Sequence, residues 1–462
     1  MLVFPDPLHA GTAPSAAAAQ ALFSLASAAL KGENARPAVA VCRAGLVVAP
    51  DVGPGWGNLM SAWRRADRAD QAVAAARRAL TLMPQSAELR LVLAMTLSGG
   101  PGATREARLA AVLAPEVAVV WFQLAKLSPS GRSALACYAR ALRVRPDWAE
   151  ARMNLGLLQL HLGDLAAGWH NKDSRWIVPG SGATIRLTRP LWHGEKLAGK
   201  RLAVLREQGI GDQFFYASVL GDVLRQGGRV LVECDHRLVT LFSRSFPTAT
   251  VVPPDDARLH AVDYQIPIGG LMRLFRPSIE SFAEPQAYLT AEPLRAELWR
   301  RRLDALGAGR KIGVCWRSRL RDAGRADNVS TIEEWGPILQ ARAGDIFVNL
   351  QYDECEAEIA TARRLFGVEL HGWSDLDRMN DFESVAALIV GLDLVVTITT
   401  NICEFAGALG RPVWALSPQV WSHFGTTTLP YYPRARCFIK ERGAAWTATM
   451  QDVARALRDD TI

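Results

Sequence analysis

The sequence lacks several features that mark particular classes of protein. Its seven cysteines are scattered without a CxxC pair, and no histidine stands at metal-ligand spacing from a second cysteine, so we expect a reduced chain without structural zinc. No apolar run reaches the roughly 18 residues of a membrane helix, and the N-terminus has no cationic segment before a long apolar core. These absences predict a cytoplasmic protein without a membrane span.

The excess of one sign of charge over the other is also small. The net charge is +7 in 462 residues, and no basic cluster is interleaved with aromatic residues as on a nucleic-acid surface. Arginines on solvated helix faces account for much of this charge, and an anionic small molecule is the partner we expect for any localised positive site. At roughly 150 residues per domain, the length predicts three units.

The first third of the chain contains a repeat. Prolines at Pro50, Pro84, Pro115 and Pro146 each close a similar helical segment, at intervals of 34, 31 and 31 residues. The 34-residue interval is the period of tetratricopeptide repeats, and residues 147–156 resemble the first helix of such a unit. We therefore predict three to four units of helical repeat over residues 15–165. Such an array either docks a polypeptide or serves as a scaffold for an enzyme.

A strand, a glycine turn, a helix and a second strand follow each other in residues 201–234. The apolar run 202–205 leads into Gly209 and Gly211, and Asp212 opens the helix. This order predicts a βαβ unit whose turn binds a ligand, although many such turns contain glycine only because they need a positive φ. Further strands at 229–233, 250–252 and 264–267 complete a small Rossmann-like sheet.

A second α/β lobe is predicted downstream. Its first strand, 311–316, delivers a polar group to its carboxyl end: Arg317, Ser318, Arg319, Arg321 and Arg325. Guanidinium groups make bidentate contacts to phosphate oxygens and stay charged at any relevant pH, which suits a nucleoside diphosphate. The alternative is an arginine-rich loop in solvent.

A second anion site is predicted where the strand 394–396 runs into a helix at 402–409. Thr399, Thr400 and Asn401 lie at this turn, where hydroxyls, free amides and the positive helix end would meet a diphosphate. Between these two strands, Gln351 follows another strand at 345–350, and Asp381 begins another helix.

The motif TITTNICEFAGALGRPVW resembles the nucleotide-sugar half of the heptosyltransferase-like branch of GT-B glycosyltransferases, and REQGIGDQ resembles its acceptor-side turn. The resemblance implies an α + α/β chain in which tetratricopeptide-like repeats precede a GT-B fold of two Rossmann-like lobes. Residues 166–295 would form a linker and the acceptor-side lobe. Residues 296–462 would form the nucleotide-sugar lobe, with a final helix that crosses back between the lobes.

The resemblance also implies roles for individual residues. Asp212 would be the general base, with Glu207, Gln208, Gly209 and Gly211 lining the acceptor-side turn; a plain helix N-cap is the alternative for Asp212. The base or ribose would contact Gln351, and the helix that begins at Asp381 would lie below the base. The reaction would be inverting, would use a nucleotide sugar and would need neither metal nor cofactor.

The sequence departs from the resembling enzymes at one turn. Many of them carry Asp-Thr there and a histidine four residues after the threonine, whereas this chain has Thr399-Thr400 and then Glu404. Glu404 either points inward, where it would repel a diphosphate, or faces solvent. The departure leaves the donor sugar, and catalysis itself, open.

The resemblance implies a metal-independent glycosyltransferase. Because the repeats suit a polypeptide, we favour protein O-glycosylation with the acceptor docked by the repeats, as in related bacterial repeat-transferases that modify flagellin. A transferase acting on a saccharide or lipid-linked acceptor is one alternative. A repeat adaptor whose lobes have lost catalysis is another. An NAD-dependent oxidoreductase also has paired α/β lobes, but no full GxGxxG follows the first strand here.

Overall fold

The structure is a computed structural model that describes residues 14–31, 36–128, 130–182, 185, 188–282, 287–319, 329–432, 434–441 and 443–459. The chain divides into two compact units, Met1–Leu155 and Gly156–Ile462. Arg321 and Arg325, which we predicted to be phosphate ligands, lie outside the described residues. Within the described ranges, no helix is both long and apolar enough to cross a membrane.

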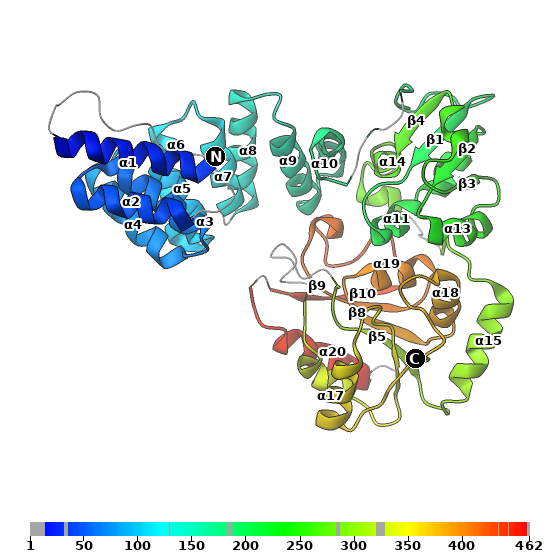
Figure 1. Ribbon diagram of the computed structural model, residues 1–462. Helices are drawn as coiled ribbons and strands as arrows, with labels where there is room; N and C mark the ends of the chain where they lie inside the picture. Colours follow the sequence, from blue (N-terminus) through cyan, green and yellow to red (C-terminus); the bar gives the residue numbers. More distant parts are fainter. Residues whose placement is uncertain are drawn as a thin grey trace. The chain divides into compact units, whose positions relative to one another are not determined.

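The first unit is built from helical hairpins, as predicted (Figure 1). The helices pack in the pairs α1 with α2, α3 with α4, α5 with α6 and α7 with α8, and each pair also contacts the next. Their bounds are α1 (Pro14–Lys31), α2 (Arg36–Val48), α3 (Gly53–Arg65), α4 (Ala69–Leu82), α5 (Ala87–Leu97), α6 (Gly100–Leu113), α7 (Ala118–Leu127) and α8 (Gly131–Val144). Each second helix ends two residues before one of the repeating prolines.

The repeating prolines have a shared structural role. The carbonyl of each one accepts a hydrogen bond from a side chain six residues further along, at the start of the next hairpin. The donors are Trp56, Arg90, Trp121 and Arg152, at 2.7 to 2.8 Å. This bond satisfies a backbone carbonyl of the loop between two hairpins, and it ties one hairpin to the next.

The second unit begins within α9 (Ala149–His161) and continues through α10 (Leu165–Lys172) and the 3₁₀ turn η1 (Asp173–Ile177). A lobe with a four-stranded parallel sheet follows, in the order β3-β2-β1-β4. Its strands are β1 (Arg201–Leu205), β2 (Arg229–Glu233), β3 (Thr250–Val252) and β4 (Tyr264–Pro267), and its helices are α11 (Ile210–Ala217), α12 (Leu220–Leu224), α13 (Val239–Ser245) and α14 (Leu271–Phe275). All four predicted strands are confirmed.

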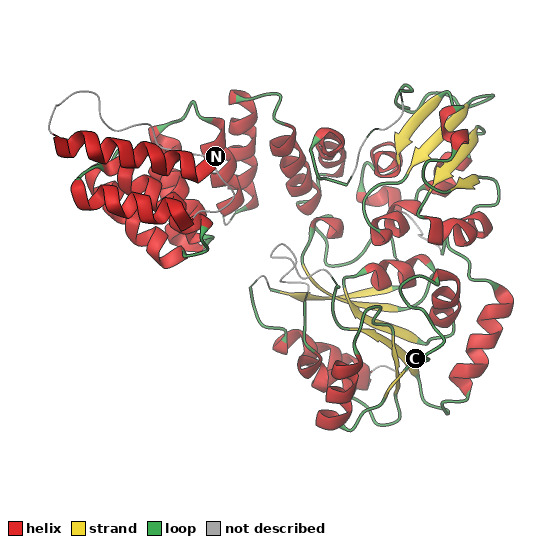
Figure 2. Cartoon of the chain, viewed as in Figure 1, coloured by secondary structure: helices red, strands yellow, loops and turns green. Residues whose placement is uncertain are grey.

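The last lobe contains a parallel sheet with helices packed around it (Figure 2). The sheet has six strands in the order β10-β9-β8-β5-β6-β7. Its strands are β5 (Lys311–Cys315), β6 (Ile346–Asn349), β7 (Leu370–His371), β8 (Leu394–Ile398), β9 (Val413–Pro418) and β10 (Ala435–Lys440). Its helices are α15 (Pro293–Asp304), α16 (Gly336–Leu339), α17 (Glu356–Phe366), α18 (Phe382–Val390), α19 (Asn401–Ala408) and α20 (Thr447–Asp459). Renumbered from β5, the order is 3-2-1-4-5-6, that of a doubly wound Rossmann sheet.

The final helix differs from its prediction. We expected α20 to cross back between the lobes, but it packs on α16 and β10 of its own lobe. Met450, Val453 and Leu457 are buried in the core of that lobe, beside Trp335 and Leu339. The apolar face of α20 therefore covers the last sheet rather than joining the two lobes. The predicted lobe division at 295/296 falls inside α15, which packs on α18 of the last lobe.

The two lobes of the second unit share one continuous apolar core. Phe214 of α11 stacks on Phe405 of α19, with ring centroids 4.4 Å apart and nearly parallel planes. Beside this stack, Arg244 of α13 forms an ion pair with Glu383 of α18 at 2.7 Å. Helical hairpins followed by two facing parallel lobes are the GT-B layout that we predicted, and the structure confirms this fold class.

Candidate functional site

The candidate site lies where the last sheet changes direction. In a doubly wound sheet, ligands bind at the carboxyl ends of the two strands on either side of the switch in strand order. Here these strands are β5 and β8, which are adjacent. Arg317 and Ser318 follow β5 and Thr399 to Asn401 follow β8, so the fold brings the two predicted phosphate groups to one edge.

Hydrogen bonds hold these two strand ends together. The hydroxyl of Thr397 donates to the carbonyl of Cys315 at 3.1 Å, and the Cys315 sulfur lies 3.7 Å from the hydroxyl of Thr400. Thr400 is the N-cap of α19, and its Oγ1 accepts the backbone N–H of Ile402 at 3.2 Å. The side-chain oxygen of Asn401 is buried without a hydrogen-bond partner among the described residues. The turn after β8 thus presents hydroxyls, an amide and a helix N-terminus.

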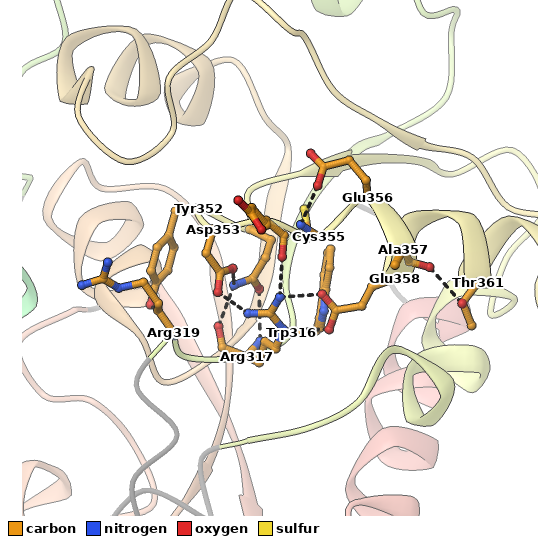
Figure 3. A network of polar contacts seen from close by, with 12 residues as sticks. Trp316, Arg317, Arg319, Tyr352, Asp353, Cys355, Glu356, Ala357, Glu358 and Thr361 are labelled. Atoms are coloured by element: carbon orange, nitrogen blue, oxygen red, sulfur yellow. Dashed lines mark hydrogen bonds and ion pairs between the residues drawn. The ribbon is translucent and has the colours of Figure 1, made fainter.

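Arg317 does not lie open to a phosphate. Its side chain is 3% exposed and is surrounded by acceptors, as Figure 3 shows. Nε and Nη2 donate to Glu358 at 2.7 and 2.5 Å, Nη1 donates to Asp353, and Nη2 also reaches the carbonyl of Glu354. Two carboxylates neutralise the guanidinium, so a phosphate would have to displace them.

The other residues predicted near the nucleotide have varied surroundings. Gln351 is fully buried, and its amide holds the backbone of Arg317 through bonds of 3.0 and 3.2 Å, so its side chain is committed to the protein. Ser318 is buried, whereas Arg319 is exposed beside Tyr352. Asp381 is the N-cap of α18, where Oδ1 accepts the N–H of Ser384 at 3.0 Å. Of these residues, Arg319 and Asp381 offer the most accessible polar groups.

The turn after β1 carries Asp212 in the first turn of α11. Its Oδ2 accepts the backbone N–H of Gly209 at 3.1 Å, so Asp212 caps the helix, and it remains partly exposed. The positive φ of this turn, +59°, belongs to Gln208 rather than to either glycine. Gly211 instead allows a close approach, because a Cβ there would lie 3.3 Å from the Cα of Asn401. The two predicted half-sites therefore meet at Gly211 and Asn401.

A buried ion pair lies behind this turn. Glu207 and Arg175 have side chains that are 0% and 1% exposed, and Arg175 binds Glu207 through three hydrogen bonds of 2.6 to 3.1 Å. The pair rests on Gly269, just past β4, where a Cβ would lie 2.5 Å from Oε1 of Glu207. Glu207 thus supports the turn from inside. We predicted that it would line the acceptor side.

Lys172 extends this cluster and was missed by the sequence analysis. Its Nζ donates to the hydroxyl of Tyr216 at 2.6 Å and lies 4.7 Å from the ring centroid of Trp421. Burial, with a smaller effect of the neighbouring Arg175, lowers the pKa of Lys172 to about 7. Lys172 and Tyr216 are 44 residues apart, so only the fold reveals the pair.

Glu404 is only partly exposed, and its carboxyl group is hydrogen-bonded within the protein. Its Oε2 accepts a hydrogen bond from the hydroxyl of Tyr432 at 2.7 Å, and that hydroxyl lies 3.3 Å from the hydroxyl of Tyr288. Burial raises the pKa of Glu404 to about 8. Gly407 makes this packing possible, because a Cβ there would overlap the ring of Tyr432. Near neutral pH, Glu404 therefore carries a proton.

No family model matches the sequence. Protein FlbA of Caulobacter vibrioides is 32% identical over 404 residues, which cover 75% of this chain and 68% of FlbA. The chain belongs to the FlbA family. The helical repeats and GT-B-like lobes described above are thus the architecture of an FlbA-family protein.

Two solved structures show weaker likenesses to this FlbA-family chain. E. coli ADP-heptose LPS heptosyltransferase II is 13% identical, covers 56% of this chain and 96% of its own, and has a TM-score of 0.40. An O-GlcNAc transferase mutant from Thermobaculum terrenum is 15% identical, covers 98% of this chain and 91% of its own, and has a TM-score of 0.27. The fold assignment is based on the strand orders and the helical hairpins.

Proposed function

We propose that this FlbA-family chain is a glycosyltransferase that moves a sugar from a nucleotide donor to a protein acceptor docked by the repeats. The observation that supports it most is the adjacency of β5 and β8, whose carboxyl ends carry Arg319, Thr399, Thr400 and Asn401. Hydroxyls, an amide and the N-terminus of α19 suit a diphosphate, and no metal or cofactor enters the proposal.

The proposed chemistry places the base on the opposite lobe. Asp212 belongs to the turn that touches Asn401 through Gly211, so a sugar bound at the end of β8 would lie within reach of its carboxylate. One carboxylate oxygen caps Gly209, which fixes the side chain in one orientation. An acceptor hydroxyl would pass its proton to Asp212 as the oxygen attacks the anomeric carbon, and the nucleoside diphosphate would leave from the opposite face with inversion.

Donor binding can be tested by calorimetric titration of the full chain with UDP, GDP, ADP and CMP, using NAD as a control. We expect one nucleoside diphosphate to bind, and Thr400→Val to weaken it because the substitution removes a hydroxyl and a helix cap. Thr361→Val is the matched control, since the Thr361 hydroxyl bonds only within α17 among the contacts described. Equal loss of affinity in both variants would argue against a site at the end of β8.

The base assignment needs turnover as its readout. We expect Asp212→Asn to abolish sugar transfer or donor hydrolysis while nucleotide affinity stays nearly unchanged. Asp256→Asn is the matched control, because Asp256 also caps a helical turn in the same lobe, by accepting the N–H of Arg258 at 2.9 Å. Full turnover in Asp212→Asn would leave Asp212 as a cap only.

A second candidate is an adaptor with inactive lobes. The neutralisation of Arg317 by Asp353 and Glu358 favours it, because this buried cation of the predicted phosphate site is already paired. This candidate predicts that none of the nucleotides binds, or that one binds without any turnover. The titration above therefore separates the two functions.

A further inference from the structure

The charge of this protein is divided unequally between its two units. Residues 1–155 contain 17 lysines and arginines against 10 aspartates and glutamates, which equals the whole net charge of +7. Residues 156–462 contain 36 of each sign and are neutral. A field of one sign over the repeats alone attracts a partner of opposite charge to that unit.

Within the repeats, the charge is concentrated on the second helix of each hairpin. The helices α2, α4, α6 and α8 together contain nine arginines and only two acidic residues. One of the two, Glu106, is taken up by a partly buried ion pair with Arg90 of α5 at 2.7 Å. We call the surface formed by these four helices the second-helix face.

Three of these arginines occupy the same place in successive hairpins. Arg43, Arg77 and Arg108 each precede the closing proline by seven residues, and all three are exposed. Within the described ranges, the second helices are not packed directly on one another, because each is packed on the first helices that flank it. The three guanidinium groups therefore add to one positive field along the face, and this field attracts an anionic partner.

Two hollows with apolar and charged walls lie between consecutive second helices. The first, of about 480 Å³, is lined by Leu80, Leu93 and Leu97 together with Arg77, Arg105 and Glu106, whose carboxylate is paired with Arg90. The second, of about 500 Å³, is lined by Val112, Trp121 and Ala136 with Arg140 and Arg143. Both have the same construction, with second helices on two sides, part of the next first helix between them, and arginines at the rim.

We propose that the second-helix face binds an acidic, amphipathic polypeptide segment that puts apolar side chains into the two hollows and carboxylates against the arginines. The proposal rests on the proposed function to the extent that this segment belongs to the protein acceptor. Hydrophobic anchors in pockets, ringed by charge pairs, are a common mode by which grooves between helices recognise an amphipathic partner.

The hollows favour a polypeptide over other anionic partners. A nucleic acid is bound mainly through its phosphates and through stacking on aromatic rings. Among the described residues, no aromatic one lines the first hollow, and the Trp121 ring in the second is already faced by Arg140 at 5.8 Å. The anionic headgroups of a membrane surface would meet the arginines, but a flat headgroup layer would leave the hollows between the helices empty. Carboxylates spaced among apolar side chains match both features of the face.

The test uses fluorescence anisotropy of the full chain with three labelled helical peptides of roughly 18 residues, about five turns. One carries leucine at every third or fourth position and glutamate elsewhere, the second has lysine for glutamate, and the third has serine for leucine. We expect the first to bind, the second not to bind, and the third to bind at least about tenfold more weakly because the hollows stay empty.

Charge reversal on the face is the decisive variant. We expect Arg77→Glu with Arg108→Glu to weaken the first peptide about tenfold or more, since each reversed charge on the second-helix face turns attraction into repulsion. Arg363→Glu with Arg364→Glu, two exposed residues of α17 in the second unit, changes the net charge equally and should bind as the wild type does. Arg77→Gln with Arg108→Gln, checked by circular dichroism, gives an intermediate loss without new repulsion.

The opposite results would overturn the proposal. They are equal binding of the lysine peptide, equal loss in the α17 variant, or tighter binding of single-stranded RNA or of vesicles containing anionic lipid than of the acidic peptide. Nucleotide titration of the same variants keeps the two proposals separate. Loss of peptide binding with intact nucleotide binding concerns the second-helix face alone, and peptide binding without any nucleotide binding would refute only the transferase.

Discussion

The pair Arg175–Glu207 provides a sharp test of how the first lobe is held together. Its side chains are 1% and 0% exposed, and three hydrogen bonds link them directly beneath the turn that carries Asp212. Removing one partner of such a buried pair typically costs about 3–5 kcal/mol, because the other charge is left without compensation. We therefore expect Arg175→Ala to lose most of this amount in the second unit.

The penalty has an upper limit that depends on pH. A stranded carboxylate can take up a proton instead of staying charged, and protonating an ordinary glutamate at pH 7 costs about 3.7 kcal/mol. That cost falls by about 1.4 kcal/mol for each unit of pH below 7. The variant should therefore lose about 3–4 kcal/mol at pH 7, and roughly 2 kcal/mol less than that at pH 5.5, relative to the wild type at the same pH.

The assay is urea unfolding followed by tryptophan fluorescence, because ten of the fourteen tryptophans lie in the second unit and dominate the signal. The matched control is Arg302→Ala. Arg302 forms an exposed pair with Asp375 at 2.6 Å, which should contribute no more than about 1 kcal/mol. A loss below 1 kcal/mol for Arg175→Ala at pH 7, or a loss that does not change with pH, would refute the reasoning.

Three further variants test the other contacts of the candidate site. The wild type should lose stability as pH rises from 4.5 to about 8, because Glu404 is ionised in that window only in the unfolded state. Glu404→Gln should not show this loss. Urea midpoints of both proteins at pH 6 and 8.5 measure the difference, and parallel pH profiles would contradict it. Gly269→Ala should cost about 2–3 kcal/mol, the upper part of the range for overpacking, because a Cβ there would push on the ion pair of Glu207 and Arg175. Gly227→Ala, at an open turn position with positive φ, should cost only its backbone strain of about 1 kcal/mol, and equal losses would contradict this. Arg317→Ala should lower the thermal midpoint while leaving nucleoside diphosphate affinity within about threefold, and a large loss of affinity alone would restore the phosphate role predicted for it.

The sequence predicted the sheets well for a physical reason. Strands buried on both faces read as short apolar runs, and β1, β2 and β8 are such runs, each followed by polar or glycine-containing turns. The edge strand β10 was missed because buried and exposed residues alternate along it, and β7 because it has only two residues. Element positions were thus predictable wherever burial on both faces left a continuous signal.

The site was less predictable than the sheets. Strand ends and the switch in strand order were enough to bring Thr400 and Asn401 beside the end of β5. The sequence did not reveal which side chains pair with each other, because the partners lie far apart along the chain. Arg175 and Glu207 are 32 residues apart, and Arg317 and Glu358 are 41 residues apart. A charged residue after a strand can face a ligand or an acidic neighbour, and only the tertiary structure separates these outcomes.

Each of the two lobes of the second unit contains a buried arginine that is paired with carboxylates, and this bears on the proposed donor site. At each switch in strand order, a buried arginine is already neutralised by carboxylates of the protein: Arg175 by Glu207, and Arg317 by Asp353 and Glu358. These guanidinium groups fix the backbone around the turns, and the second unit as a whole is neutral. Recognition of a diphosphate at the end of β8 would then depend on Thr399, Thr400 and the N-terminus of α19, with Arg319 as an exposed cation nearby. The surplus positive charge lies on the repeats, so the proposed donor and the proposed polypeptide partner would be bound by different physical forces.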